Sequence, residues 1–182
     1  MRKKTKKYLT LLFVLLVTIC NGQVKVGEKV PKYVFKNVVN DNKSFDISNQ
    51  NKPLILEFWA TWCSPCIPAM KKLEGFQKKY QGQIEILAIS TEDPKNLMRY
   101  IENHNANLKI AYDTLHLKAF KYTYIPHSIL IDKDGYVKAI TTPDKISDEI
   151  MKLFVLGKEF EIPQNEIDNY ISEISLNKEV KN

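Results

Sequence analysis

The sequence predicts an α/β domain in which a central mixed β-sheet is flanked by helices. Two near-continuous apolar runs, Leu54–Ala60 and Ile84–Ser90, are typical of strands that are covered on both faces. A segment with helical spacing follows each run, and Asp132-Lys133-Asp134-Gly135 is a turn sequence that predicts a hairpin between two short strands. Strands that alternate with helices and then end in a hairpin favour a mixed sheet over a purely parallel one.

The predicted elements fill residues 26–157, which we expect to form one domain. The segment Tyr33–Val39 is expected to be extended and to end in a turn at Asn40–Lys43. The remaining strands are expected over Leu108–Tyr112, Ser128–Ile131 and Tyr136–Ile140, and the helices over Pro65–Tyr80, Asp93–Asn105, Thr114–Phe120 and Ile146–Leu156.

Residues 158–182 are expected to form a C-terminal helical extension. Within Pro163–Leu176, four apolar or aromatic residues recur at helical spacing: Ile167, Tyr170, Ile171 and Ile174. Such a one-sided pattern predicts a helix that packs on the domain.

Residues 1–22 have the pattern of an export signal. Basic residues as far as Lys7 precede an apolar stretch over Tyr8–Ile19, which is shorter than the roughly 20 residues that a membrane span needs. Cleavage after Gly22 is the preferred interpretation. Acylation of Cys20 and retention as a membrane anchor are the alternatives. The protein is therefore expected in the periplasm or another extracytoplasmic space.

The net charge of +6 comes from this leader. Residues 1–22 contain five basic residues and no acidic ones, so 22 basic and 21 acidic residues remain after cleavage. Because the mature chain has almost no basic surplus, we expect no nucleic-acid partner. We also expect a monomer that needs no cofactor.

Export leaves two cysteines, Cys63 and Cys66, in an oxidising compartment. They lie in Trp62-Cys63-Ser64-Pro65-Cys66, between the first apolar run and the helix that follows it. Two intervening residues allow the sulfurs to bond to each other. The free amide groups of a helix N-terminus favour the thiolate of Cys63 as a nucleophile, and Cys66 would then resolve the mixed disulfide.

A structural disulfide or half of a zinc site are the other interpretations of this pair. A structural zinc site takes four ligands, and the sequence has no second pair of closely spaced cysteines. The three histidines, His104, His116 and His127, are scattered along the chain. We therefore expect redox catalysis and no metal site.

Two motifs about 60 residues apart, Glu57–Cys66 and Tyr124–Gly135, resemble those of thioredoxin-like thiol–disulfide oxidoreductases of the exported TlpA/ResA type. The resemblance covers roughly residues 26–157. It implies a thioredoxin-like fold with a four- or five-stranded mixed sheet and flanking helices. It also implies that the protein exchanges its dithiol with disulfides of other proteins outside the cytoplasm.

The resemblance assigns roles to individual residues. Cys63 matches the attacking cysteine and Cys66 the resolving one. Pro126 matches a cis-proline that faces the disulfide. A cis bond there would expose the backbone of Ile125 for strand-like pairing with a bound partner chain.

Glu57 is an acidic residue within an apolar strand. An unpaired carboxylate would be costly to bury, so we expect Glu57 to be protonated part of the time. The resemblance implies that a carboxylate at this strand position lies beneath the resolving cysteine and relays protons. Glu57 is thus a candidate general base for Cys66, and a structural ion pair with a lysine is the alternative.

Two further residues within the motifs are also assigned. Trp62 is expected to shield the disulfide and contact partners, with core packing as the alternative. His127 stands where the family has Thr, and we expect it to face solvent in a loop.

The leading interpretation is an extracytoplasmic oxidoreductase that reduces disulfides in exported proteins, such as cysteine pairs of apocytochromes. The resemblance implies a membrane electron donor. A peroxiredoxin-type peroxidase is one alternative, since Thr61 precedes the active cysteine. A copper-binding chaperone that uses Cys63 and Cys66, with or without His127, is the other.

Overall fold

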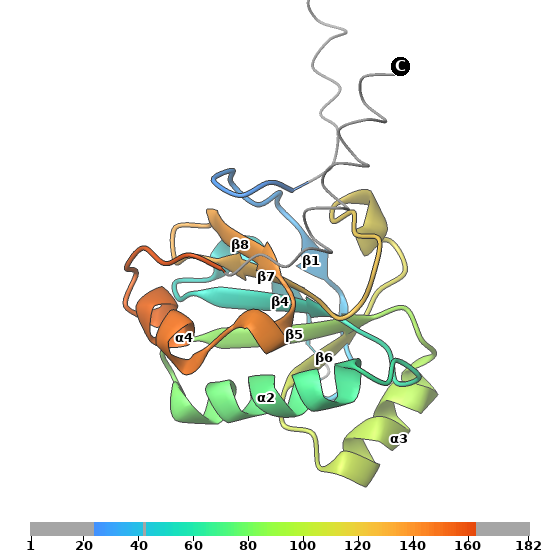
Figure 1. Cartoon of the computed structure of the whole chain (residues 1–182). Coiled ribbons are helices and arrows are strands. Elements are labelled where there is room, and N and C mark those ends of the chain that lie inside the picture. Colours follow the sequence, from blue (N-terminus) through green and yellow to red (C-terminus); the bar gives the residue numbers. More distant parts are fainter. Residues whose placement is uncertain (1–23, 42, 163–182) are drawn as a thin grey trace, which may run out of the picture.

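The computed structural model of the protein describes residues 24–41 and 43–162 (Figure 1). The expected leader and the expected C-terminal helix over 163–176 lie outside these residues. The strands are β1 (Val34–Phe35), β2 (Asn37–Val38), β3 (Phe45–Asp46), β4 (Leu54–Phe58), β5 (Glu85–Ser90), β6 (Lys109–Tyr112), β7 (His127–Ile131) and β8 (Val137–Thr141). The α-helices are α2 (Cys66–Lys79), α3 (Pro94–His104) and α4 (Asp148–Val155), and the 3-10 helices are η1 (Ile47–Asn49), η2 (His116–Lys118) and η3 (Pro143–Lys145).

The main sheet is mixed, as the sequence predicts. Its strand order is β2-β6-β5-β4-β7-β8, and β1 and β3 form a separate two-stranded sheet. Strands β4, β5 and β6 are parallel, whereas β2, β7 and β8 each run antiparallel to their neighbours. The fold is thioredoxin-like. The expected number of four or five strands is too low, because Asn37 and Val38 pair with Tyr112 and Ala111 at the edge of the sheet.

The three α-helices pack on the same face of this sheet, not on both faces. The crossovers from β4 to β5 and from β5 to β6 step in one direction, and right-handed crossovers then place α2 and α3 on one side (Figure 1). Residues of α4, such as Met151 and Phe154, belong to the same buried cluster as those of α2 and α3. The other face is covered by β1, β3 and η1 together with Phe120.

The side chains of β4 alternate between these two faces. Ile55 belongs to the cluster on the helical face, and so does Trp59, which follows the strand. Leu54, Leu56 and Phe58 belong to the cluster on the other face. Glu57 lies between Ile55 and Trp59 and, by the alternation of a strand, points towards the helical face.

Two loops of the domain differ in how well the sequence predicts them. The turn at 132–135 joins β7 to β8 as expected, with Asp132 accepting hydrogen bonds from the amides of Asp134 and Tyr136. The helix expected over Thr114–Phe120 is wrong, since only the three-residue η2 forms there. Asp113 accepts the amides of Leu115 and His116 and so closes a single turn.

In the described part of the chain, no helix combines the length and apolar character needed to cross a membrane.

Candidate active site

A disulfide joins Cys63 and Cys66 at the carboxyl end of β4. Their Cα atoms are 5.2 Å apart. The amide of Cys63 donates to the carbonyl of Ala60, and the amide of Cys66 donates to the carbonyl of Cys63. These two turns bring the sulfurs together. The helix begins at Cys66, so Cys63 lies in the turn before α2 and not within the helix.

Pro65 and Pro68 fit this start of α2. Pro65 is the N-cap residue, and Pro68 lies in the first turn. An amide in the first turn of a helix has no intrahelical acceptor, so a proline there breaks no hydrogen bond. The helix therefore starts beside the disulfide without disruption.

Both sulfur-bearing residues are largely covered in the oxidised protein. Cys66 is fully buried and Cys63 is 4% exposed. Sγ of Cys63 lies 3.8 Å from the carbonyl oxygen of Ile125. Trp62, in contrast, is 74% exposed, which rules out core packing for this side chain. The solvent-exposed indole ring of Trp62 thus forms part of the surface beside the disulfide.

The peptide bond between Ile125 and Pro126 is cis, as predicted. It lies directly before β7, which is antiparallel to β4. The start of β7 therefore meets the end of β4, where the cysteine loop begins. This arrangement explains how the carbonyl of Ile125 reaches Sγ of Cys63 although 62 residues separate them in sequence.

Glu57 is fully buried on the helical face of the sheet. Its Oε2 accepts a hydrogen bond of 2.5 Å from the hydroxyl of Ser128, and its Oε1 has no hydrogen-bond partner among the described residues. The pKa of Glu57 is raised from 4.5 to about 8. Burial is the cause of the rise, and the hydrogen bond from Ser128 offsets a part of it. Within residues 24–41 and 43–162 no lysine pairs with Glu57, so the described structure does not support the alternative of a structural ion pair.

Glu57 and the two cysteines lie on the same side of the sheet. The neighbours of Glu57 on the helical face, Ile55 and Trp59, belong to the same buried cluster as Cys63 and Cys66. The carboxyl group of Glu57 therefore faces the side of the sheet on which Cys63 and Cys66 are also buried. A carboxyl group with a pKa near 8 can exchange a proton at neutral to mildly alkaline pH.

His127 is not in a solvent-facing loop. It is the first residue of β7, is 7% exposed, and pairs with Phe58 across the strands. Its ring packs against Tyr122 and Tyr124 as well as Phe58. Burial lowers the pKa of His127 from 6.5 to about 4.

The position of His127 also bears on metal binding. Residues 127 and 128 alternate across the sheet, so His127 faces away from the side on which Cys66 lies. The copper ligand set that includes this histidine is therefore wrong. Within 24–41 and 43–162, no three His, Cys, Asp or Glu side chains are grouped closely enough to hold a metal ion.

Sequence reasoning missed Glu92, which binds the loop ahead of Cys63. Its carboxylate accepts hydrogen bonds from both the amide and the hydroxyl of Thr61. The signal was present, because Glu92 follows β5 as Thr61 follows β4, and parallel neighbours end at the same edge of a sheet. It also missed Ser128, which binds Glu57.

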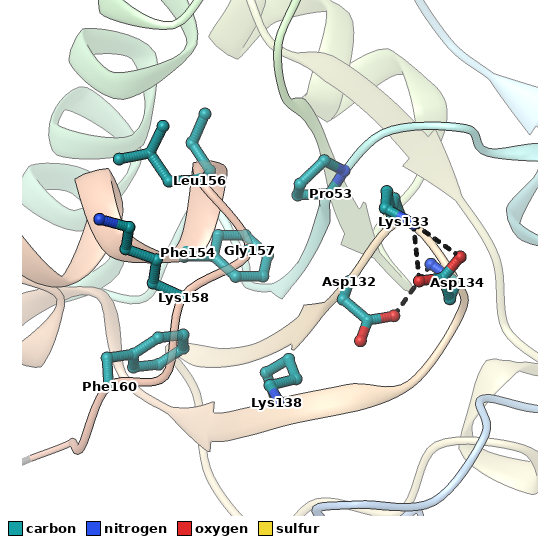
Figure 2. A pocket seen from close by; sticks show the side chains of 11 residues that line it. Pro53, Asp132, Lys133, Asp134, Lys138, Phe154, Leu156, Gly157, Lys158 and Phe160 are labelled. Carbon is teal, nitrogen blue, oxygen red and sulfur yellow. Dashed lines mark hydrogen bonds and ion pairs between the residues drawn. The ribbon is translucent and has the colours of Figure 1, made fainter.

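A cavity of about 180 Å³ lies elsewhere in the domain (Figure 2). Figure 2 shows Phe154 and Phe160 on one side of it and Asp132 and Lys133 on the other. Asp132 follows the last residue of β7, whereas the cis-proline precedes the first. The cavity is thus at the far end of β7 from the disulfide and is not part of this site.

A thioredoxin-like fold with a disulfide at the end of the central strand and a cis-proline opposite it defines a thiol–disulfide oxidoreductase. A model of the Redoxin family matches residues 25–153, and the chain belongs to this family. The chain is thus a thiol–disulfide oxidoreductase of the redoxin family, similar to proteins of the ResA type.

Two relatives and one solved structure illustrate the similarity. The chain is 31% identical over 132 residues to the thiol-disulfide oxidoreductase ResA of Geobacillus thermodenitrificans and 32% identical over 133 residues to that of Geobacillus kaustophilus. Each alignment covers 70% of this chain and 75% of the relative. A thiol:disulfide interchange protein of the thioredoxin family from Chlorobium tepidum has a TM-score of 0.58 and 25% identity, over 72% of this chain and 99% of that one.

Proposed function

We propose that this oxidoreductase acts outside the cytoplasm and reduces disulfides in exported proteins. The observation that carries the proposal is the contact of Sγ of Cys63 with the carbonyl of Ile125, next to the exposed Trp62. This arrangement sets a main-chain acceptor and an apolar ring beside the sulfur that would attack. Both suit a polypeptide substrate better than a small molecule. The leader pattern of residues 1–22 supports export.

The reaction begins with the reduced protein. The thiolate of Cys63 attacks one sulfur of the substrate disulfide, and the other substrate sulfur leaves as a thiolate and takes up a proton. A mixed disulfide now joins Cys63 to the substrate. The thiolate of Cys66 then attacks Sγ of Cys63, and the second substrate sulfur leaves. The substrate has gained two electrons, and the protein ends with the Cys63–Cys66 disulfide that the structure contains.

Glu57 supplies the base for the second attack. The Cys66 thiol transfers its proton to Oε1, the carboxyl oxygen without a hydrogen-bond partner among the described residues. The bond from Ser128 stays on Oε2. Because Cys66 is fully buried, bulk water is a poor competitor for this proton. The burial of Glu57 on the same side of the sheet as Cys66, with one carboxyl oxygen lacking a hydrogen-bond partner among the described residues, supports its role as the acceptor.

Ile125, Pro126 and Trp62 bind the substrate in this proposal. A substrate segment pairs with the backbone of Ile125 as an added strand would, and packs on the indole ring of Trp62. The oxidised protein is then re-reduced by a membrane dithiol reductase, which donates two electrons and closes the cycle.

Trapping tests the proposal. In cells that produce the full chain as Cys66→Ser, the mixed disulfide cannot be resolved, so exported proteins should accumulate as adducts of Cys63 that a thiol reductant releases. Cys63→Ser is the matched control and should trap nothing. The proposal is wrong if no exported protein is trapped, or if Cys63 of the reduced protein resists alkylation by iodoacetamide while Cys66 reacts. Consumption of hydrogen peroxide by Cys66→Ser would favour the peroxidase instead.

A further inference from the structure

Three polar side chains form one row across the buried helical face of the sheet. Glu57 on β4 pairs in register with Ser128 on β7, and Ser128 pairs with Thr141 on β8. The next row on the same face is wholly apolar and consists of Ile55, Leu130 and Ala139. The polar row is the one nearer the disulfide, because β4 ends and β7 begins there. Polar residues are thus confined to the part of this face that adjoins the reacting sulfurs.

All three members of the row are buried. Glu57 and Ser128 are fully buried, and Thr141 is 4% exposed. Two of their polar atoms have no hydrogen-bond partner among the described residues, namely Oε1 of Glu57 and Oγ1 of Thr141. Because an unpartnered buried polar group costs free energy, its presence at the site calls for a functional reason.

The hydroxyl groups of the row can form a directional chain. Ser128 donates its only hydroxyl proton to Oε2 of Glu57, and its oxygen can still accept a bond. Thr141 is its direct cross-strand neighbour, and such neighbours have Cβ atoms about 5 Å apart. A small rotation of the threonine side chain allows its hydroxyl to donate to Ser128. Bonds in such a chain strengthen one another.

We propose that Ser128, supported by Thr141, is a positioning residue that holds Oε2 of Glu57 against β7 and leaves Oε1 free to take the proton of Cys66. This inference rests on the proposed role of Glu57 as the base. It adds that the orientation of the carboxyl group is set by the sheet and not by the helix. The first helical turn can then change contacts during disulfide exchange while the base stays in place.

Few other groups influence Glu57. Among the described residues, the buried cluster on the helical face contains three titratable side chains, those of Cys63, Cys66 and Tyr100 of α3, while His127 faces the other side. The residues that α4 buries on this face are apolar: Ile150, Met151 and Phe154. Burial and the hydrogen bond from Ser128 are the two causes of the shifted pKa of Glu57. A substitution at Ser128 should therefore change the titration of Glu57.

The experiment follows the titration of the Glu57 carboxyl group by carbon-13 NMR in the oxidised full-length protein. Ser128→Ala should shift the titration upward by about one pH unit, because a bond that favours the ionised form is lost. Thr141→Val should shift it in the same direction but less. Ser128→Thr keeps the hydroxyl and should restore the wild-type titration.

The same variants are tested in the resolving step. The rate at which Cys66 releases a model peptide from its mixed disulfide with Cys63 is measured against pH. Ser128→Ala should raise the midpoint of this pH profile by the same amount as it raises the titration of Glu57. At pH values below the midpoint, the rate should then be up to tenfold lower than in wild type. A merely structural role would change stability without moving the midpoint.

Different results would contradict the role of Glu57 and the role of Ser128. If Glu57→Gln leaves the pH profile of the resolving step unchanged, the role of Glu57 as the base is wrong. If Glu57→Gln removes the profile but Ser128→Ala leaves both the titration and the midpoint in place, the positioning role of Ser128 is overturned while that of Glu57 stands. An unchanged titration in Thr141→Val overturns the support from Thr141.

Discussion

Glu92 holds Thr61 with both of its carboxylate oxygens. Oε2 accepts the amide of Thr61 at 2.5 Å, and Oε1 accepts its hydroxyl at 2.7 Å. Glu92 is itself tied to the end of β5, since its amide donates to the hydroxyl of Ser90. Thr61 lies two residues before Cys63, so the loop after one parallel strand fixes the loop that carries the attacking sulfur.

The substitution Glu92→Ala should loosen this loop. Two bonds to a charged, partly exposed group are lost, so the free energy of unfolding should fall by about 1–2 kcal/mol. Disulfide exchange should slow because Cys63 is less well placed opposite Ile125. Urea unfolding and the rate of insulin reduction measure the two effects. Glu102→Ala, which removes an exposed acid of α3, is the control for the loss of charge. Equal exchange rates for Glu92→Ala and wild type would show that the contact has no part in placing Cys63.

The substitution Trp62→Ala should separate protein substrates from small ones. The side chain is 74% exposed, so its removal should change the free energy of unfolding by no more than about 0.5 kcal/mol. A protein substrate loses apolar contact with the indole, which predicts a severalfold higher KM for insulin. The rate with glutathione disulfide should stay nearly the same. An equal loss with both substrates would argue against a binding surface at Trp62.

The sequence predicted the parts of the site that depend on local patterns. The apolar run before Cys63 marks β4, and the spacing of Cys63 and Cys66 fits the disulfide. The buried Glu57 could also be foreseen, because its neighbours on both sides are apolar. In each case the signal lies within a few residues of the feature that it predicts.

The parts that escaped prediction depend on strand register. The sequence indicates a strand that begins at Ser128, but β7 begins one residue earlier, and this places His127 under the aromatic rings of the other face. Because side chains alternate along a strand, the residue before Ser128 joins the opposite face once the strand extends to it. Glu92 resembles an ordinary loop acid because its partner, Thr61, is 31 residues away. Only the pairing of β4 with β5 brings the two together.

The pH dependence of stability should reveal the buried acid. Glu57 titrates near 4.5 when unfolded and near 8 when folded, so between these values the unfolded chain has lost a proton that the folded chain retains. The free energy of unfolding should therefore fall as pH rises from 4.5 to 8, by an amount on the order of 3–5 kcal/mol.

The substitution Glu57→Gln removes this titration. Its free energy of unfolding relative to wild type should rise between pH 4.5 and 8 and be constant above that range. Urea unfolding of the oxidised proteins at a series of pH values measures the difference. A difference that does not vary with pH would mean that Glu57 is ionised in the folded protein.

His127 should make the free energy of unfolding fall as pH decreases, which is the opposite of the effect of Glu57. Burial among Phe58, Tyr122 and Tyr124 lowers its pKa from 6.5 to about 4, so the unfolded chain takes up a proton first as pH falls. The stability that the neutral ring provides is complete above pH 6.5 and is lost as pH falls towards 4, by about 3 kcal/mol.

His127→Phe keeps an aromatic ring and breaks no hydrogen bond at Nδ1, which has no partner among the described residues. Its stability should exceed that of wild type by an amount that grows as pH falls through this window, as measured by thermal unfolding. If the two proteins lose stability in parallel, the ring of His127 is protonated inside the fold, and the aromatic packing has to accommodate a charge.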